Sequence, residues 1–479
     1  MKLREFFPNL KLEERLANLE IKNISRDSHT LKKGDMFFII EGASFDIFSI
    51  LNQIKDKVAV FVGDKKKKKV IVSVLKEAPV IYVDDPYKEF RKAVDKLYSH
   101  SLEGLTFIGV TGSNGKTTTA FVIYELLKMF KKPTSLIGTV GYYIEDKKME
   151  ATYTTPDYLS LRKLLSLIKK RNSYVVMEVS SHALQQKRVE GIEFSQCIFT
   201  NLSRDHLDYH STMQSYFKAK ERLFLDNPKA TALVNIDNYY GRKLVSQIDN
   251  HLVTYGFKKK AHFRAYDLTI SKEGSRFTLL HREKTYPIRI KLLGRHNILN
   301  ILAGFASLVE LGFNPDAVAK FLPQLNSPLG RLQLIDREIY VDYAHTPQAL
   351  KTTLATLREV GYQKVVCVFG CGGDRDKGKR AVMGEVASCL ADFTILTSDN
   401  PRSEDPYQIV SQIEKGFKRD NYTVVLDRRE AIKKALEIGR RQKCAVLIAG
   451  KGHENYQIIK DRRIPFCDTS VVRELLKNE

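Results

Sequence analysis

A glycine-rich segment near residue 110 constrains the fold of this chain more than any other feature. It reads Thr111-Gly-Ser-Asn-Gly-Lys-Thr-Thr-Thr119, follows the apolar run 105–110 and precedes the helical pattern 120–130. A strand, a glycine turn, Lys-Thr and a helix in this order are typical of a phosphate-binding loop. The segment therefore predicts an α/β domain that binds a nucleotide, although Val110 stands where the usual pattern has its first glycine.

The residue types of this segment suit the binding of phosphate. Gly112 and Gly115 allow a tight turn in which backbone N–H groups point at phosphate oxygens, and the following helix adds the partial positive charge of its N-terminus. We expect Lys116 to contact the β- and γ-phosphates of ATP and the Thr117 hydroxyl to bind Mg²⁺. The alternative is a glycine turn without a ligand. The predicted nucleotide-binding residues of the loop are Gly112, Ser113, Asn114, Gly115, Lys116, Thr117 and Thr118.

Length and composition indicate a globular protein of several domains. The 479 residues suffice for about three domains. No apolar run reaches the roughly 18 residues that a membrane-spanning helix needs, and the first twenty residues carry charges throughout, unlike a signal peptide. The six cysteines are scattered, which is typical of free thiols in a reducing compartment. We therefore expect a cytoplasmic protein without a membrane span.

The net charge of +22 raises the question of nucleic-acid binding. Lysines and arginines are spread over the whole chain, and the one dense run, Lys65 to Lys69, has the composition of a solvated loop. A basic ATPase that binds nucleic acid would also carry a basic stripe with interleaved aromatic residues, and the sequence has none. We expect no nucleic-acid partner. A surface that attracts anionic substrates is another explanation of the charge.

Apolar runs alternate with helical patterns along the whole chain, which predicts an α/β fold of three domains. We place a small α/β domain at residues 1–100, a central phosphate-loop domain with a parallel sheet at 101–325, and a doubly wound, Rossmann-like domain at 326–479. The strands expected in the last domain are 364–369, 393–397, 422–426 and 445–449.

Polar residues follow two apolar strands of the central domain, 173–179 and 196–201. Ligands of open parallel sheets collect at the carboxyl ends of the strands. Glu178 stands at such an end, where a carboxylate near phosphates is an expected magnesium ligand, and a helix-capping glutamate is the alternative. His206, in the polar segment 201–210, could bind a metal or serve as a structural hydrogen-bonding residue.

Eleven motifs, in order along the whole chain, resemble those of the Mur ligases, the ATP-dependent enzymes that form amide bonds in peptidoglycan precursor synthesis. The motifs are TGSNGKTTT (111–119), TTPD (154–157), MEVSSHAL (177–184), NLSRDHLDYH (201–210), YFKAKERLF (216–224), GRHNILN (294–300), GRLQ (330–333), VDYAHTP (341–347), GCGGDRDKGKR (370–380), DNPR (399–402) and AGKGHE (449–454).

The resemblance implies a set of residues that act on ATP and Mg²⁺. Lys220 matches the lysine that this family often carries as a carbamate. An amine adds CO₂ only when it is neutral, and the resulting anion would stabilise the metal. The implied catalytic residues are Lys116, Glu178, His206 and Lys220, and the implied magnesium ligands are Thr117, Glu178, His206 and Lys220. Further nucleotide-binding residues are Asn297, Asn300, Arg331 and Asp342.

The resemblance also implies a UDP-linked substrate, UDP-N-acetylmuramoyl-L-alanyl-D-glutamate. Ser28 matches the serine that binds uridine in the family. The first domain departs from the family pattern, because the usual Asp-Gly-His stretch after Gly42 is replaced by residues 45–48, and the usual Asp-Ser-Arg is Asp27-Ser28-His29. The residues that match the muramoyl-dipeptide site are Thr154, Thr155, Ser181 and Arg188.

The third substrate implied by the resemblance is meso-diaminopimelate. This amino acid is lysine with a further carboxylate at its far end, so a site that selects it needs a cation. Arg402 of the DNPR motif supplies one, and this arginine-containing form resembles the diaminopimelate-adding branch. The alternatives are L-lysine as substrate, another ligase of the superfamily that includes folylpolyglutamate synthetase, and an Arg402 that only stabilises a turn. The expected amino-acid site is Arg375, Asp399, Asn400, Arg402, Gly450 and Glu454, with Glu454 facing the distal ammonium.

The reaction implied for the family explains why three domains are needed. Transfer of the γ-phosphoryl group of ATP onto a carboxylate gives an acyl phosphate, which an amine then attacks, releasing phosphate. The protein positions the reactants and neutralises crowded anions. We expect the UDP-substrate on the first domain, ATP on the second and the amino acid on the third, in a monomer whose partners are these small molecules.

Overall fold

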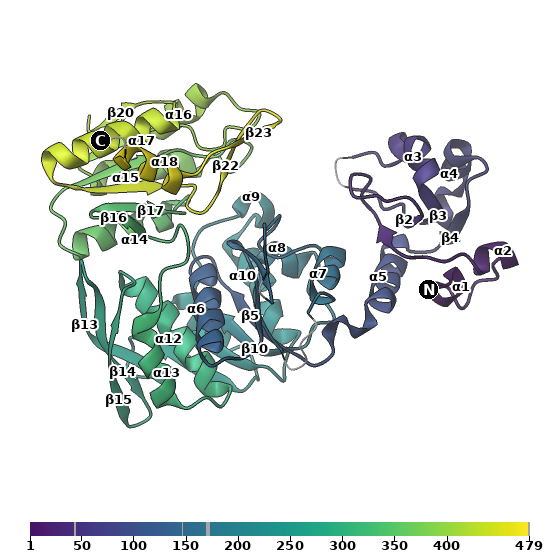
Figure 1. Cartoon of the computed structure of the whole chain (residues 1–479), viewed down its shortest axis with the longest axis horizontal. Coiled ribbons are helices and arrows are strands. Elements are labelled where there is room, and N and C mark those ends of the chain that lie inside the picture. The colour runs from purple at the N-terminus through teal and green to yellow at the C-terminus, as the bar shows by residue number, and fades with distance from the viewer. Residues whose placement is uncertain (43–44, 146, 169–172, 478–479) are drawn as a thin grey trace. The chain divides into compact units, whose positions relative to one another are not determined.

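The computed structural model describes residues 1–42, 45–145, 147–168 and 173–477 of the chain. These form two compact units, the first of residues 1–103 with 157–169 and the second of residues 104–156 with 170–479 (Figure 1). Among the described residues, no helix is both long enough and apolar enough to cross a bilayer.

The first unit is built on a parallel sheet whose four strands lie in sequence order. Its elements are α1 (Leu3–Phe6), α2 (Glu14–Ala17), β1 (Ile24–Ser25), β2 (Asp35–Phe38), α3 (Phe48–Ile54), β3 (Val58–Asp64), α4 (Lys68–Leu75), β4 (Val80–Val83), α5 (Pro86–Leu97) and α7 (Tyr158–Leu165). Helices cover both faces of the sheet. Phe37 and Phe61 pack with α3 and α4 on one face, whereas Met36, Phe38 and Val60 pack with α1, α5 and α7 on the other.

The lysine run 65–69 differs from the expected loop. It forms a short 3-10 turn, Lys65–Lys67, that continues directly into α4. Asp64 starts this turn, because its Oδ1 accepts a hydrogen bond from the backbone N–H of Lys66 at 2.8 Å. The side chains of the run are exposed, as expected. The loop prediction was therefore wrong about the backbone, since a capping aspartate before the lysines lets the chain begin a helix.

The phosphate-loop segment lies in an eleven-stranded sheet of the second unit, in the order β15-β14-β13-β12-β11-β10-β5-β9-β6-β7-β8. The strands from β13 to β6 in this order are parallel neighbours, and antiparallel pairs complete both edges. The strands are β5 (Leu105–Thr111), β6 (Thr134–Gly138), β7 (Gly141–Ile144), β8 (Lys147–Met149), β9 (Ser173–Glu178), β10 (Phe194–Phe199), β11 (Thr231–Asn235), β12 (Leu252–Gly256), β13 (Phe263–Ser271), β14 (Gly274–His281) and β15 (Lys284–Ile290).

Helices cover both faces of this sheet as well. They are α6 (Lys116–Met129), α8 (Ser181–Gln185), α9 (Leu207–His210), α10 (Met213–Leu225), α11 (Tyr239–Val245), α12 (Arg295–Glu310) and α13 (Pro315–Phe321). On one face α6 and α12 pack together over Ile108, Val110 and their neighbours. Their close approach requires Gly304, where a Cβ would lie 2.4 Å from Val122 Cγ1. The helix that follows the phosphate loop is thus fixed between the sheet and α12.

A six-stranded sheet, in the order β16-β17-β21-β18-β19-β20, forms the rest of the second unit, and all its pairs except β16–β17 are parallel. Its elements are β16 (Gln333–Asp336), β17 (Ile339–Asp342), α14 (Pro347–Glu359), β18 (Val365–Phe369), α15 (Lys379–Leu390), β19 (Phe393–Leu396), α16 (Pro406–Glu414), β20 (Tyr422–Val424), α17 (Arg428–Gln442), β21 (Ala445–Ala449), and α18 (Asp468–Lys477) after the hairpin β22 (Tyr456–Ile459) and β23 (Arg462–Pro465). Alternate residues of β18 pack with α14 to α16 or with α17 and α18. The predicted α/β fold class and the four predicted strands are confirmed.

A buried ion pair joins the last two helices of the chain. Arg428 Nε and Nη2 donate to the two carboxylate oxygens of Asp468, each at 2.8 Å, and neither side chain is exposed. We expect Arg428→Ala to lower the free energy of unfolding by about 3–5 kcal/mol, because it leaves a buried carboxylate without a partner. Urea unfolding followed by circular dichroism measures this loss.

The neighbouring pair provides the control for that experiment. Arg429 Nη1 lies 2.8 Å from Glu474 Oε2, and the two side chains are 43% and 57% exposed. Arg429→Ala should therefore cost about 1 kcal/mol or less. Equal losses for the two variants would show that burial of the Arg428–Asp468 pair has no energetic consequence.

Candidate active site

The predicted phosphate loop connects β5 to α6 and turns through two glycines with positive φ. Gly112 has φ +145° and Gly115 has φ +87°. A Cβ would lie 2.0 Å from Thr200 Oγ1 at the first position and 2.5 Å from Asn300 Oδ1 at the second. Both positions require glycine because any side chain would clash with these neighbours. The backbone N–H groups at the start of α6 have no partner within the helix and are available for an anion.

Lys116 begins α6 and folds back over the loop. Its Nζ donates to the carbonyl oxygens of Gly112 at 2.8 Å and Ser113 at 2.9 Å. Burial lowers the pKa of Lys116, and the carboxylate of Glu178 opposes that shift. A desolvated cation within the loop interacts strongly with an incoming anion, and a bound phosphate would replace these carbonyl partners.

Glu178 ends β9 beside the loop and is 1% exposed. Its Oε2 accepts from Thr117 Oγ1 at 2.9 Å, and its Oε1 accepts from the backbone N–H of Thr139 at 2.7 Å. It does not cap the following helix, because Ser180 Oγ accepts that hydrogen bond from Ala183. A carboxylate and a hydroxyl next to a phosphate loop are the oxygen ligands that Mg²⁺ prefers, so these two residues fit a magnesium ion.

Lys220 extends from α10 to the same loop. It is 1% exposed, and its Nζ donates to the Gly112 carbonyl at 2.9 Å, the oxygen that Lys116 also contacts. Burial, and then the charge of Lys116, lower the pKa of Lys220 well below its usual value. A lowered pKa increases the fraction of neutral amine, which is the form that reacts with CO₂.

His206 precedes α9 with φ +53°. Its Nε2 lies 3.5 Å from Asp205 Oδ2, and its ring centroid lies 4.9 Å from that of His182. Burial lowers its pKa, which favours the neutral imidazole that metals bind. Among the described residues, no three His, Cys, Asp or Glu side chains converge on one metal position. The pair Thr117–Glu178 is therefore the part of the predicted metal site that the structure brings together.

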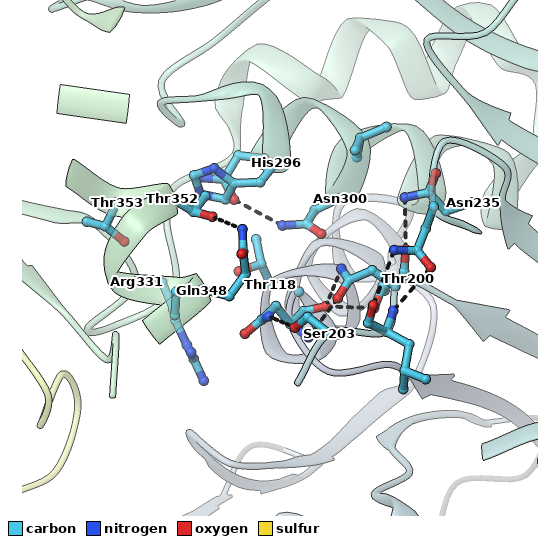
Figure 2. Close-up of a pocket in the computed structure, with 18 of the residues that line it drawn as sticks. Thr118, Thr200, Ser203, Asn235, His296, Asn300, Arg331, Gln348, Thr352 and Thr353 are labelled. Carbon is cyan, nitrogen blue, oxygen red and sulfur yellow. Dashed lines mark hydrogen bonds between the residues drawn. The ribbon is translucent and has the colours of Figure 1, made fainter. Parts of the chain in front are cut away.

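A cavity of about 400 Å³ opens beside the loop. Figure 2 shows that both domains of the second unit line it: Thr118, Thr200 and Asn235 belong to the eleven-stranded domain, and Gln348, Thr352 and Thr353 lie on α14 of the six-stranded domain. All four residues predicted to bind the nucleotide beyond the loop line this cavity, namely Asn297, Asn300, Arg331 and Asp342.

Hydrogen bonds fix the predicted nucleotide-binding side chains around the cavity. Asn300 Oδ1 accepts from Thr119 Oγ1 at 3.2 Å, and its Nδ2 donates to Asn297 Oδ1 at 3.1 Å. Arg331 Nη2 donates to Thr117 Oγ1 at 2.9 Å, so the segment leading to the six-stranded domain contacts the phosphate loop. Burial raises the pKa of Asp342, whose carboxylate accepts from two backbone N–H groups.

The residues predicted for the muramoyl-dipeptide lie next to Glu178. Thr155 Oγ1 donates to the Glu178 carbonyl at 2.8 Å, and Arg188 Nη1 donates to the Thr155 carbonyl at 2.8 Å. Thr154 Oγ1 lies 3.0 Å from Thr139 Oγ1, and the Thr139 hydroxyl donates a hydrogen bond to the Glu178 carboxylate. Ser181 begins α8, directly after the same strand end. Ser28 lies in the first unit, half-buried in the turn that follows β1.

The predicted amino-acid site gathers at the ends of β19 and β21. Asn400 Nδ2 donates to Glu454 Oε2 at 2.9 Å. Gly450 has φ +113° and approaches Asp399 so closely that a Cβ would lie 2.7 Å from its Oδ2. Arg402 Nη1 donates to the Gly373 carbonyl at 2.7 Å. This bond is also what an arginine that only stabilises a turn would make, so the substrate role of Arg402 stays a prediction.

Two arginines lie close together in this group. Burial, and then the positive charge of Arg375, lower the pKa of Arg402, whereas the carboxylates of Asp399 and Glu454 oppose that shift. Two guanidinium groups near two carboxylates form a site with both signs of charge. Such a site suits a zwitterionic end group that carries a carboxylate and an ammonium.

Sequence reasoning missed several residues of these sites. Lys451 is fully buried between Asn400 and Glu454, and the AGKGHE motif that contains it was quoted without giving it a role. Ser113 Oγ donates to the hydroxyl of Tyr216 on α10, which joins two motifs that are a hundred residues apart. Thr200 directly follows β10 and Asn235 ends β11, and both line the cavity. Their position at the carboxyl ends of parallel strands could have identified them from the sequence.

Family models match most of the second unit. The Mur ligase middle domain matches residues 110–308, and the Mur ligase, glutamate ligase domain matches residues 330–452. These two segments contain the phosphate loop, the cavity residues and most of the residues predicted for the amino acid.

Curated relatives match over nearly their whole length. The chain is 39% identical over 487 residues to UDP-N-acetylmuramoyl-L-alanyl-D-glutamate--2,6-diaminopimelate ligase 1 of Clostridium acetobutylicum, with 100% of this chain and 99% of the relative covered. It is 37% identical over 461 residues to the diaminopimelate ligase of the same type from Aquifex aeolicus, with 95% and 94% covered.

Solved structures of Mur ligases have the same fold as this chain. A UDP-N-acetylmuramoyl-L-alanyl-D-glutamate--2,6-diaminopimelate ligase superposes with a TM-score of 0.65 at 30% identity, with 100% of this chain and 99% of that one covered. The MurF ligase of Thermotoga maritima in complex with ADP superposes with a TM-score of 0.63 at 18% identity, with 95% and 98% covered, and shares the fold.

Proposed function

Since this chain belongs to the Mur ligase family, we propose that it joins meso-diaminopimelate to UDP-N-acetylmuramoyl-L-alanyl-D-glutamate in ATP-dependent peptidoglycan precursor synthesis. Full-length relatives at 36–39% identity carry the name of this activity. The single observation that carries the choice of amino acid is the mixed-charge group at the ends of β19 and β21, where Arg402 lies near Arg375 and Glu454.

We propose that each domain holds one substrate: residues 1–100 the UDP group, 101–325 ATP and 326–479 the amino acid. Ser28 would contact uridine, and Thr154, Thr155, Ser181 and Arg188 would hold the muramoyl-dipeptide beside Glu178. A reaction that uses ATP and a UDP-linked precursor belongs in the cytoplasm. One chain supplies all three regions, which supports a monomer.

The chemistry begins with activation of the D-glutamate carboxylate. A carboxylate is a poor acyl donor because its leaving group would be oxide. Its oxygen attacks the γ-phosphorus, the bond from that phosphorus to the bridging oxygen breaks, and ADP leaves. Lys116 and the backbone N–H groups of the loop are placed to neutralise the phosphoryl oxygens during this transfer. A magnesium ion held by Thr117 and Glu178 would add charge neutralisation at the same oxygens.

The amine then attacks the acyl phosphate. The carbon–nitrogen bond forms, a proton leaves the nitrogen, and phosphate departs as the tetrahedral intermediate collapses. Asn400, Arg402 and Glu454 would hold the far end of diaminopimelate so that its reacting amine is aimed at the acyl carbon. Arg331 joins the six-stranded domain to the phosphate loop, which supports closure of that domain over the acyl phosphate.

We propose that Lys220 acts as a carbamate. Its lowered pKa and its position against the Gly112 carbonyl support the modification. The ammonium groups of Lys116 and Lys220 both contact the Gly112 carbonyl, and a carbamate on Lys220 would replace one of these two positive charges with a negative one. The Lys220 carbamate and His206 would then join Thr117 and Glu178 as the magnesium ligands that the family resemblance implies.

Transfer of oxygen isotope tests the acyl-phosphate route. The D-glutamate carboxylate of the UDP-substrate is labelled with ¹⁸O, and the phosphate released during ligation is analysed by mass spectrometry. One labelled oxygen should appear in each phosphate, because that oxygen bridges carbon and phosphorus in the intermediate. Unlabelled phosphate accompanied by normal ligation would rule out the acyl phosphate.

Replacing Arg402 tests the proposed substrate. We expect Arg402→Ala to raise the KM for diaminopimelate about 10²-fold or more, because a buried carboxylate that loses its cation costs about 3–5 kcal/mol. The KM values for ATP and for the UDP-substrate should stay near those of the wild type. Steady-state phosphate release measures all three.

Arg441 offers a matched control, because it is an exposed arginine of the same domain, on α17. Arg441→Ala should leave every kinetic constant near the wild-type value. If Arg402→Ala also uses diaminopimelate normally, Arg402 does not contact the distal carboxylate and the choice of amino acid loses its support.

A further inference from the structure

Lys451 is a buried cation inside the proposed amino-acid site, and its ammonium faces two residues of that site. It follows β21, and its side chain is fully buried. The glycines on either side have positive φ, +113° at Gly450 and +55° at Gly452. A Cβ at Gly452 would lie 2.7 Å from Tyr343 Cβ. The Gly-Lys-Gly segment thus turns tightly at the strand end and directs the lysine inward.

The ammonium of Lys451 closes a triangle of polar contacts. Its Nζ donates to Asn400 Oδ1 at 3.1 Å and to Glu454 Oε2 at 3.0 Å. The third side is the hydrogen bond from Asn400 Nδ2 to the same Glu454 oxygen, at 2.9 Å. Ile458 N–H also donates to Asn400 Oδ1, at 3.0 Å. The turn that holds Asn400 and the stretch 451–458 therefore meet around this ammonium.

These contacts determine which way both partners face. The oxygen of the Asn400 amide is directed at Lys451 and Ile458, so its nitrogen must face Glu454. The hydrogen bonds that the Glu454 carboxylate accepts within the described part of the chain both reach Oε2, which leaves Oε1 for a ligand. Without the ammonium, the carboxylate would lose its cation and one of its two donors.

We propose that Lys451 is a positioning residue for diaminopimelate: it holds Asn400 and Glu454 so that the free carboxylate oxygen faces the distal ammonium of the substrate. It also holds the Glu454 carboxylate in one orientation before the substrate arrives, which reduces the ordering required on binding. This inference rests on the proposed function, and it concerns binding of one substrate. Lys451 does not itself touch the reacting atoms.

The test replaces Lys451 with methionine, which keeps the length of the side chain and removes its charge and donors. We expect the KM for diaminopimelate to rise about 10- to 100-fold, the usual effect of losing a hydrogen bond to a charged group. The turnover number at saturation and the KM values for ATP and the UDP-substrate should stay near wild type. Lys434→Met, at an exposed lysine on α17, is the control and should change none of them. A lysine that only supports the fold would change all the constants together.

A double-mutant cycle shows whether Lys451 acts through Glu454. If it does, Lys451→Met combined with Glu454→Gln should have the same KM for diaminopimelate as Glu454→Gln alone. This comparison remains valid if Lys451→Met by itself does not fold, because the double variant has no unpaired carboxylate. A further rise in the double variant, or a normal KM in Lys451→Met, would overturn the proposal. If Arg402→Ala and Glu454→Gln both use diaminopimelate normally, the proposed function fails instead.

Discussion

Lys220→Ala should be almost inactive in ligation, and short carboxylates such as formate or acetate should restore part of its activity. The expected loss is about 10²- to 10³-fold in turnover, the size found when one electrostatic group is removed from a transition state. The reason is the position of Lys220, buried against the phosphate loop at the Gly112 carbonyl with a lowered pKa. Added carboxylates would supply the anion that the missing carbamate provides.

Lys218→Ala is the matched control, because Lys218 lies on the same helix and is exposed. It should retain wild-type activity and show no response to carboxylates. Intact-protein mass spectrometry under CO₂ should detect the carbamate on the wild type and not on Lys220→Ala. Full wild-type activity in CO₂-depleted buffer, with a free ammonium at Lys220 in a high-resolution map, would contradict the carbamate.

Lys116→Ala should lose at least about 10²-fold in turnover while keeping its fold. The Lys116 ammonium is desolvated in the loop and contacts the Gly112 and Ser113 carbonyls, so its charge should matter most as the γ-phosphoryl group moves. Single-turnover phosphate release measures the chemical step directly. Lys128→Ala, at an exposed lysine of the same helix, should be normal. Retention of more than about a tenth of the wild-type turnover by Lys116→Ala would remove the phosphate loop from the mechanism.

The strands of this fold could be predicted because most of them are parallel and buried on both faces. Such strands are short apolar runs bounded by polar residues, and β18 to β21 lie where those runs stand in the sequence. The lysine run 65–69 was misread because one side-chain cap, Asp64, decides whether the chain turns into a helix.

Long-range packing was harder to predict than the strands. Residues 157–168, which start at the last residue of the TTPD motif, group with the first unit although the rest of that motif belongs to the second. Tyr158 on α7 donates from its hydroxyl to Asp95 Oδ1 at 2.5 Å, and Arg162 lies near the same carboxylate. No local pattern indicates this contact, because its two sides are separated by some sixty residues.

In the candidate site too, features with a local sequence pattern could be predicted and features that depend on long-range packing could not. Glu178 and the loop residues were found because they stand at strand ends and in a recognisable turn. The burial of Lys451 could not be predicted from the sequence, because it depends on contact with Asn400, some fifty residues earlier, and because lysines are rarely buried. The position of Arg402 near Arg375 also depends on the folding of two separate loops against each other.

Ligation of meso-diaminopimelate and of L-lysine, compared in separate reactions, tests the central claim most directly. The enzyme is given ATP, Mg²⁺ and UDP-N-acetylmuramoyl-L-alanyl-D-glutamate with either meso-diaminopimelate or L-lysine, and phosphate release and product mass are measured. We predict one phosphate per amide formed and a kcat/KM for diaminopimelate about 10⁴-fold above that for lysine, because lysine leaves the cations of the site without a carboxylate. Equal or preferred use of L-lysine, or no ligation of either amino acid, would contradict this account.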